Sequence, residues 1–191
     1  RYYTPSGRLI QRPYEDGNDL AYYRELYETD RESKIDSLKE LRPKFKTKSG
    51  RTVYGGGGIT PDIYIPFKST INIETAKVLR NPKRPFFNFT SKRAANYKGK
   101  FDSFDEFKKG WDVPDSLFNS FLEHLESDSI NVVRDSLSRD MDYISNRIKS
   151  ELAGSIWGKN ESTNLRLLMD NQVSEALKHF DEADAFIKSI N

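Results

Sequence analysis

The sequence predicts an α+β fold that is mostly α-helical, with a few strands near the N-terminus and helices in the rest of the chain. Apolar and polar residues alternate from Ile59 to Ile65, which is the period of a half-buried strand. Over most of 72–191, apolar residues instead recur at three- and four-residue steps, which is the period of an amphipathic helix. Glycine and proline turn signals are concentrated before residue 66. These patterns predict two regions, 1–66 and 72–191.

The first region, 1–66, carries the strand signals. Residues 1–11 predict a strand because apolar side chains flank a Pro-Ser-Gly turn. A further strand is predicted within 51–66, and Pro61 favours an edge position for it because proline has no amide donor. Between these strands, residues 18–42 predict a helical insertion with a charged outer face.

The second region, 72–191, is predicted to be an all-helical domain. Pro85 suits the first turn of a helix, and Asp102 or Ser103 suits an N-cap. The longest predicted helix places Val133 and Leu137 on one face with later apolar residues, followed by Gly158 as a C-terminal glycine. We interpret these stripes as core-facing surfaces. The predicted helices are 71–80, 85–97, 102–111, 113–127, 131–156 and 171–190.

Composition excludes several functions. The chain has 31 Lys and Arg residues against 29 Asp and Glu, and a net charge of +2 does not indicate a nucleic-acid or anionic-membrane partner. It has no cysteine, which excludes disulfides, thiol catalysis and cysteine metal sites. No apolar run approaches the roughly 18 to 20 residues that span a bilayer. The first residues, starting at Arg1, already resemble a strand, so we expect the chain to be part of a longer protein.

The four glycines 55–58 could form a phosphate-binding loop, a flexible linker, or a turn that leads into a strand. A phosphate-binding loop requires a Gly-Lys-Ser/Thr sequence that opens a helix, and here Ile59 and a predicted strand follow instead. Alternation resumes directly after the glycines, which argues against a linker. We therefore favour the turn, in which glycine also lets another backbone segment approach closely.

Other candidate sites have simple structural interpretations. His124 and His179 lie on amphipathic helices without metal-ligand spacing, so we predict no metal site and no cofactor. Residues 77–100 hold eight basic residues interleaved with aromatic ones, a pattern that can bind single-stranded nucleic acid. A helix that buries its phenylalanines and solvates its lysines explains the same pattern, so we expect no nucleic-acid partner.

Two separated motifs, within 1–11 and 55–66, resemble the strand-turn-strand that closes the catalytic domain of the C-terminal processing peptidases, or tail-specific proteases. The long link between the motifs and the helical remainder are similar to the Bacteroides-type branch of that family. The positions that match the family pattern are Tyr3, Pro5, Gly7, Arg8, Gln11, Gly58, Ile59, Pro61, Asp62 and Ile63.

The resemblance implies a serine endopeptidase with a Ser nucleophile and a Lys general base. In the family both residues, the oxyanion hole and a PDZ domain precede the first motif, so we expect the nucleophile and the base upstream of residue 1. We accordingly assign no catalytic residue within the chain, and neither Ser6 nor the pair Ser91 and Lys92 is a candidate. The fragment alone is expected to be inactive.

The resemblance also implies location and partners. The parent is expected to be extracytoplasmic, either periplasmic or membrane-associated, and to process or degrade proteins from their C-termini. Protein or peptide substrates would bind through its other domains. Unpaired strand edges or the helical domain could form a homo-oligomer. The alternative hypothesis is a non-enzymatic helical module for interaction or assembly, whose amphipathic faces bind a partner.

Overall fold

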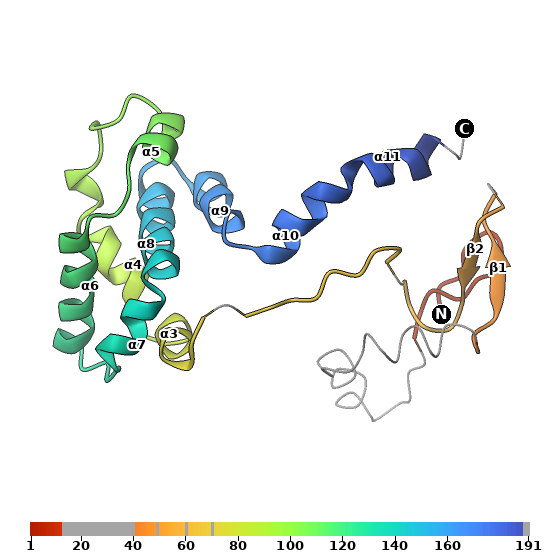
Figure 1. Ribbon diagram of the computed structural model, residues 1–191, viewed down its shortest axis with the longest axis horizontal. Helices are drawn as coiled ribbons and strands as arrows, with labels where there is room; N and C mark the ends of the chain where they lie inside the picture. The colour runs from red at the N-terminus through yellow and green to blue at the C-terminus, as the bar shows by residue number, and fades with distance from the viewer. Residues whose placement is uncertain (13–40, 49, 60, 70, 189–191) are drawn as a thin grey trace. The chain divides into compact units, whose positions relative to one another are not determined.

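The computed structural model describes residues 1–12, 41–48, 50–59, 61–69 and 71–188 (Figure 1). The chain divides into two compact units, which are treated separately below. The first unit comprises 1–66 together with the C-terminal segment from His179, and the second is Phe67–Lys178. Within the described residues the fold is mostly helical with one two-stranded sheet, which confirms the predicted α+β, mostly α class.

The elements are as follows. The first unit contains β1 (Lys44–Lys46), β2 (Thr52–Tyr54) and α11 (Phe180–Lys188). The 3-10 helix η3 (Leu177–His179) lies at the boundary of the units. The second unit contains α3 (Ile73–Leu79), α4 (Pro85–Ser91), the 3-10 helix η2 (Ala94–Asn96), α5 (Phe104–Gly110), α6 (Asp115–Ser127), α7 (Arg134–Arg139), α8 (Met141–Ile156), α9 (Lys159–Leu167) and α10 (Asn171–Ala176).

The strands are shorter than predicted. β1 and β2 pair antiparallel, with Phe45 opposite Val53. The prediction of a strand across 51–66 was wrong beyond Tyr54, because residues 61–66 have an irregular backbone. A strand requires a neighbour for its backbone groups, and alternation in sequence does not supply one.

Two further corrections concern the same region. The predicted strand at 1–11 is reduced to a single antiparallel bridge between Tyr3 and Leu9. β1 itself was not predicted. Of the predicted helical insertion at 18–42, residues 18–40 lie outside the described residues, and Leu41 and Arg42 are not helical.

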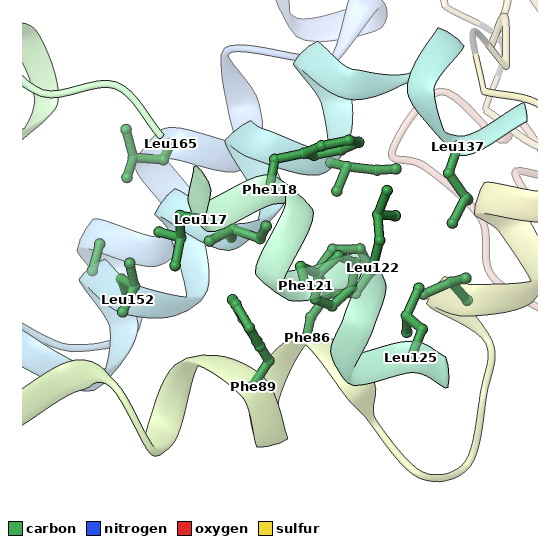
Figure 2. Close-up of a cluster of buried hydrophobic side chains, with 14 of the residues drawn as sticks. Phe86, Phe89, Leu117, Phe118, Phe121, Leu122, Leu125, Leu137, Leu152 and Leu165 are labelled. Atoms are coloured by element: carbon green, nitrogen blue, oxygen red, sulfur yellow. The ribbon is translucent and has the colours of Figure 1, made fainter. Parts of the chain in front are cut away.

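The hydrophobic core lies in the second unit, where α8 packs mainly against α9 and α4 and also contacts α6 (Figure 2). Phe86 stacks on Phe121 with ring centroids 4.6 Å apart, and Phe89 meets the same ring edge-on at 5.2 Å. Buried side chains of α6 were predicted from its stripe, and all of them are in the core: Leu117, Phe118, Phe121, Leu122 and Leu125.

Local sequence signals correctly predicted where two helices begin, α4 and α5. α4 begins at Pro85, as predicted, and ends at Ser91 before η2. α5 begins after Ser103, whose Oγ accepts a hydrogen bond from the Glu106 amide at 3.2 Å. The predicted N-cap choice therefore resolves to Ser103, because a hydroxyl at that position satisfies a free amide of the first turn.

The predicted continuous helix 131–156 was wrong, because the chain breaks at Asp140 between α7 and α8. The Asp140 carboxylate accepts a hydrogen bond at 2.8 Å from the backbone N–H of Asn72, so a contact between residues remote in sequence lies at the break. Val133, predicted to be in the stripe, precedes α7 and is 57% exposed.

The predicted helix 171–190 is present over the described residues 171–188, but the prediction was wrong in burial. It divides into α10, η3 and α11, and Leu177, Phe180 and Ile187 remain exposed. α9 was not predicted, although its Leu165 is in the core. Its polar sequence, KNESTNLRL, gives too little apolar periodicity to identify a helix.

Candidate functional site

The first motif forms a tight hairpin. Tyr3 and Leu9 pair across it, and the Gly7 amide donates to the Thr4 carbonyl at 2.9 Å. Gly7 has a positive φ of 77°, which suits glycine, while Pro5 and Tyr3 are exposed. The Pro-Ser-Gly turn identified in the sequence is therefore present.

Arg8 and Leu9 join this hairpin to the second strand. The Arg8 Nε donates to the Tyr54 carbonyl at 2.8 Å, and the Gly56 amide donates to the Leu9 carbonyl at 3.0 Å. The structure therefore brings the first motif into contact with the start of the glycine run, although about 46 residues separate them in sequence.

Three of the four glycines, 55, 57 and 58, lie close to side chains of other segments. A Cβ on Gly55 would lie 2.7 Å from the Phe45 ring, and a Cβ on Gly57 would overlap the Arg42 guanidinium. Gly58 has a φ of 80°, and a Cβ there would lie 3.2 Å from the Arg12 Cγ. The sequence predicted that another backbone segment fills the space beside the glycines, whereas the atoms closest to the missing Cβ positions belong to side chains of neighbouring segments.

Sequence reasoning missed the residues that surround the glycines, Arg12, Arg42 and Phe45. Arg12 directly follows the first motif, which could have drawn attention to it, whereas nothing in the sequence around Arg42 and Phe45 marks a contact. Arg12 is buried, with 9% exposure, an unusual environment for an arginine.

The remaining matched positions are arranged more loosely. Asp62 forms an ion pair with Arg51 at 3.0 Å, with both side chains largely exposed. Ile59 is 74% exposed, Pro61 is exposed, and Ile63 is partly buried. The Gln11 Oε1 is buried and has no hydrogen-bond partner within the described residues.

The hairpin borders a cavity of about 400 Å³. Its polar walls combine cations and hydroxyls, and the Ser6 hydroxyl lies 3.0 Å from the Thr4 hydroxyl. Within the described residues the Ser6 hydroxyl is bonded to the Thr4 hydroxyl and not to a lysine or histidine, so the geometry does not identify it as an activated nucleophile. The cavity is lined by Thr4, Pro5, Ser6, Arg8, Lys46, Thr47, Lys48 and Val53.

The two histidines occupy helical positions, as predicted. The His124 ring lies 5.5 Å from the Phe89 ring, and its Nε2 is 3.6 Å from Asp128. His179 contacts Glu182 at 3.2 Å on the same helical segment. No group of three or more potential metal ligands occurs in the part of the chain that the structure describes.

The basic and aromatic segment 77–100 contributes to the core. Phe86 and Phe89 are buried, and the Arg93 guanidinium lies 3.8 Å from the Phe89 ring centroid. Phe87 is 40% exposed beneath Arg84. Burial raises the pKa of Tyr97, which packs edge-on against Trp111. Two of the four rings, those of Phe86 and Phe89, are therefore buried in the core.

Comparison with known proteins gives one match. The model of a family described as "Family of unknown function (DUF8443)" matches residues 83–158, which include α4 to α8. No curated protein and no solved structure matches the chain. Across the described residues, no helix combines the length and the apolar character needed to cross a membrane.

Proposed function

We propose that the chain is the C-terminal part of a serine endopeptidase of the C-terminal processing type, extracytoplasmic, which processes or degrades proteins from their C-termini. The observation that supports the proposal is the contact between the two family-like motifs. The Leu9 carbonyl of the first motif accepts a hydrogen bond from the Gly56 amide of the second, and Arg8 donates to the carbonyl of Tyr54, which directly precedes the second motif. Two motifs that form one structural element are stronger support than two isolated sequence matches.

In this proposal the Ser nucleophile and the Lys base belong to residues that precede Arg1. The role of the present residues is structural: Arg8 fixes the hairpin against β2, and the glycines admit the side chains of Phe45, Arg42 and Arg12. The backbone groups at the hairpin and strand edges would then pair with strands of the protease core.

The test compares the full-length protein with residues 1–191 alone, using an unstructured protein substrate and mass spectrometry of the products. We expect cleavage by the full-length protein and none by residues 1–191. Gly58→Val in the full-length protein should lower kcat/KM, because the new side chain would contact Arg12. Gly110→Val serves as the matched control, since a Cβ there meets no atom within 4 Å. An inactive full-length protein, or cleavage by residues 1–191, would contradict the proposal.

A second candidate function is a helical module for interaction or assembly. It is favoured by the apolar side chains of the C-terminal segment, where Leu177, Phe180 and Ile187 are each about 60% exposed. Light scattering of the purified chain tests this hypothesis. A dimer that becomes a monomer in Phe180→Asp, with an unchanged circular dichroism spectrum, would support it, and a monomer at all concentrations would count against self-assembly.

A further inference from the structure

The second unit contains a cleft that no sequence motif marked. It lies between the end of α5, the segment that follows it, α8 and the C-terminal end of α9, and its volume is about 510 Å³. A volume in this range suits a small organic ligand. The cleft is lined by Lys149, Ser145 and Asp112, by five apolar side chains, and by further polar residues.

Lys149 is the most unusual residue of the cleft. It is only 8% exposed, and its Nζ donates to the Lys108 carbonyl at 2.9 Å. It also lies 3.3 Å from the Asp112 Oδ1 and 5.7 Å from the Phe107 ring centroid. An ammonium has three N–H donors, and these contacts use two of them. A buried charged group is stable only when it is paired and hydrogen-bonded. An acceptor for the third N–H would therefore stabilise Lys149.

Ser145 adds an unused polar group to the lining of the same cleft. It precedes Lys149 by four residues on α8, so the two side chains share one face of the helix. Its Oγ is buried and has no hydrogen-bond partner within the described residues. A buried hydroxyl left without a partner is unfavourable, and a bound oxygen atom would satisfy it.

Asp112 shows how an anion can reach Lys149. Its side chain is fully exposed, yet its carboxylate contacts the buried Nζ. A carboxylate can therefore approach the ammonium from the open side of the cleft. Since the Asp112 side chain is exposed to solvent, a ligand carboxylate could replace it at the Lys149 ammonium.

The remaining walls determine what the carboxylate must carry. The apolar lining residues favour a hydrocarbon body, and only one lysine in the lining is buried. Asp142, which also lines the cleft, disfavours a doubly charged group such as phosphate. The apolar lining residues are Val113, Met141, Leu165, Leu168 and Met169.

We propose that this cleft binds a small amphiphilic monocarboxylate, of the class of medium-chain fatty acids, with its carboxylate on Lys149 and Ser145 and its hydrocarbon along α9. The site lies in the helical unit and is independent of the proposed peptidase function.

The experiment is calorimetric titration of the whole chain with octanoate, and with octanamide as the uncharged analogue of the same length. Octanoate should bind saturably, and octanamide at least tenfold more weakly, because the contact with an ammonium is charge-assisted. Lys149→Met should weaken octanoate binding by roughly ten- to a hundredfold, the range of a hydrogen bond to a charged group. Lys98→Met, an exposed lysine outside the cleft, should leave binding unchanged.

Two further variants keep the proposal falsifiable if Lys149→Met does not fold. Asp112→Asn removes the competing carboxylate and should tighten octanoate binding several-fold, whereas Ser145→Ala should weaken it by about three- to tenfold. The proposal is overturned if the folded wild-type chain shows no saturable octanoate binding up to about 5 mM. Equal binding of octanoate and octanamide, or weaker binding by Asp112→Asn, would overturn it as well.

Discussion

Different interactions stabilise each of the two units internally. In Phe67–Lys178 the structure rests on apolar packing, with Phe121 and Leu125 fully buried among other helices. Among the described residues, every buried apolar side chain of the core belongs to this unit. The first unit has instead a three-residue strand pair and backbone hydrogen bonds, while Tyr2, Tyr3 and Ile59 are exposed.

This difference indicates which of the two units can be stable by itself. Burial of apolar surface is the dominant favourable term in folding, and a two-stranded hairpin without such burial is marginal in water. The second unit therefore has the means to fold by itself. In the described part of the first unit, apolar side chains such as Tyr3 and Ile59 are exposed and available to a neighbouring segment, as the proposed place of the motifs in a larger protease core requires.

The largest effect should come from removing a ring of the core. Phe121→Ala should lower the free energy of unfolding by about 3 to 5 kcal/mol, because the ring is fully buried and contacts Phe86 and Phe89. Urea unfolding followed by circular dichroism measures the loss. The control is Phe87→Ala, which is 40% exposed and should cost much less. Equal losses would refute the core described here.

The next effect concerns the close packing of α8 on α9. A Cβ on Gly154 would lie 3.1 Å from the Ser162 Cβ, so Gly154→Val should destabilise the second unit by about 1 to 3 kcal/mol. Thermal denaturation provides the measurement. Gly110→Val, where the new atoms meet nothing within 4 Å, should be closer to wild type. The reverse order of stability would show that α9 packs differently.

A smaller effect should follow from Asn72→Ala. The Asn72 Oδ1 caps α3, and its Nδ2 donates to the Ser136 carbonyl of α7. We expect a loss of about 1 to 2 kcal/mol in urea unfolding. Ser103→Ala removes a cap without an equivalent side-chain bond to another helix and should cost less. If the two variants lose the same free energy, the bond to α7 contributes nothing measurable.

Glu74 predicts a pH dependence of the same unit. A hydrogen bond from Lys77 is the main cause that lowers the pKa of Glu74, aided by the Val133 amide and opposed by desolvation. The contribution of Glu74 is therefore complete above its ordinary pKa of 4.5 and is lost as the pH falls through the lower folded value. Unfolding of Glu74→Gln measured from pH 7 to pH 3 should show a shallower acid loss than wild type. Parallel curves would exclude this role.

The smallest global effect should come from the first unit. Arg8→Met removes the bond to the Tyr54 carbonyl, so hydrogen exchange should increase near β2. The thermal midpoint of the second unit should stay unchanged, because Arg8 belongs to the other unit. Arg51→Met, which removes an exposed ion pair with Asp62 and a contact with the Phe186 ring but no bond to the backbone of β2, is the control. A lower midpoint in Arg8→Met would show that the units are energetically coupled.

The sequence by itself determined the helical class, the beginnings of α4 and α5, and the buried face of α6. These features depend on local signals: a proline at the first turn, a capping serine, and apolar side chains at helical spacing. It also indicated that the glycine run admits a close neighbour, but not which side chains fill the space.

Only the tertiary structure decided the break at Asp140, the burial of Lys149 and the reduction of the strands. At the break, the Asp140 carboxylate accepts a hydrogen bond from the backbone N–H of Asn72, 68 residues away in sequence. Lys149 is buried because the end of α5 supplies a carbonyl. A strand exists only where another strand satisfies its backbone groups, so the alternation from Ile59 to Ile65 did not suffice. For Asp140 and Lys149 the partner is distant in the chain, and periodicity reports only neighbours in sequence.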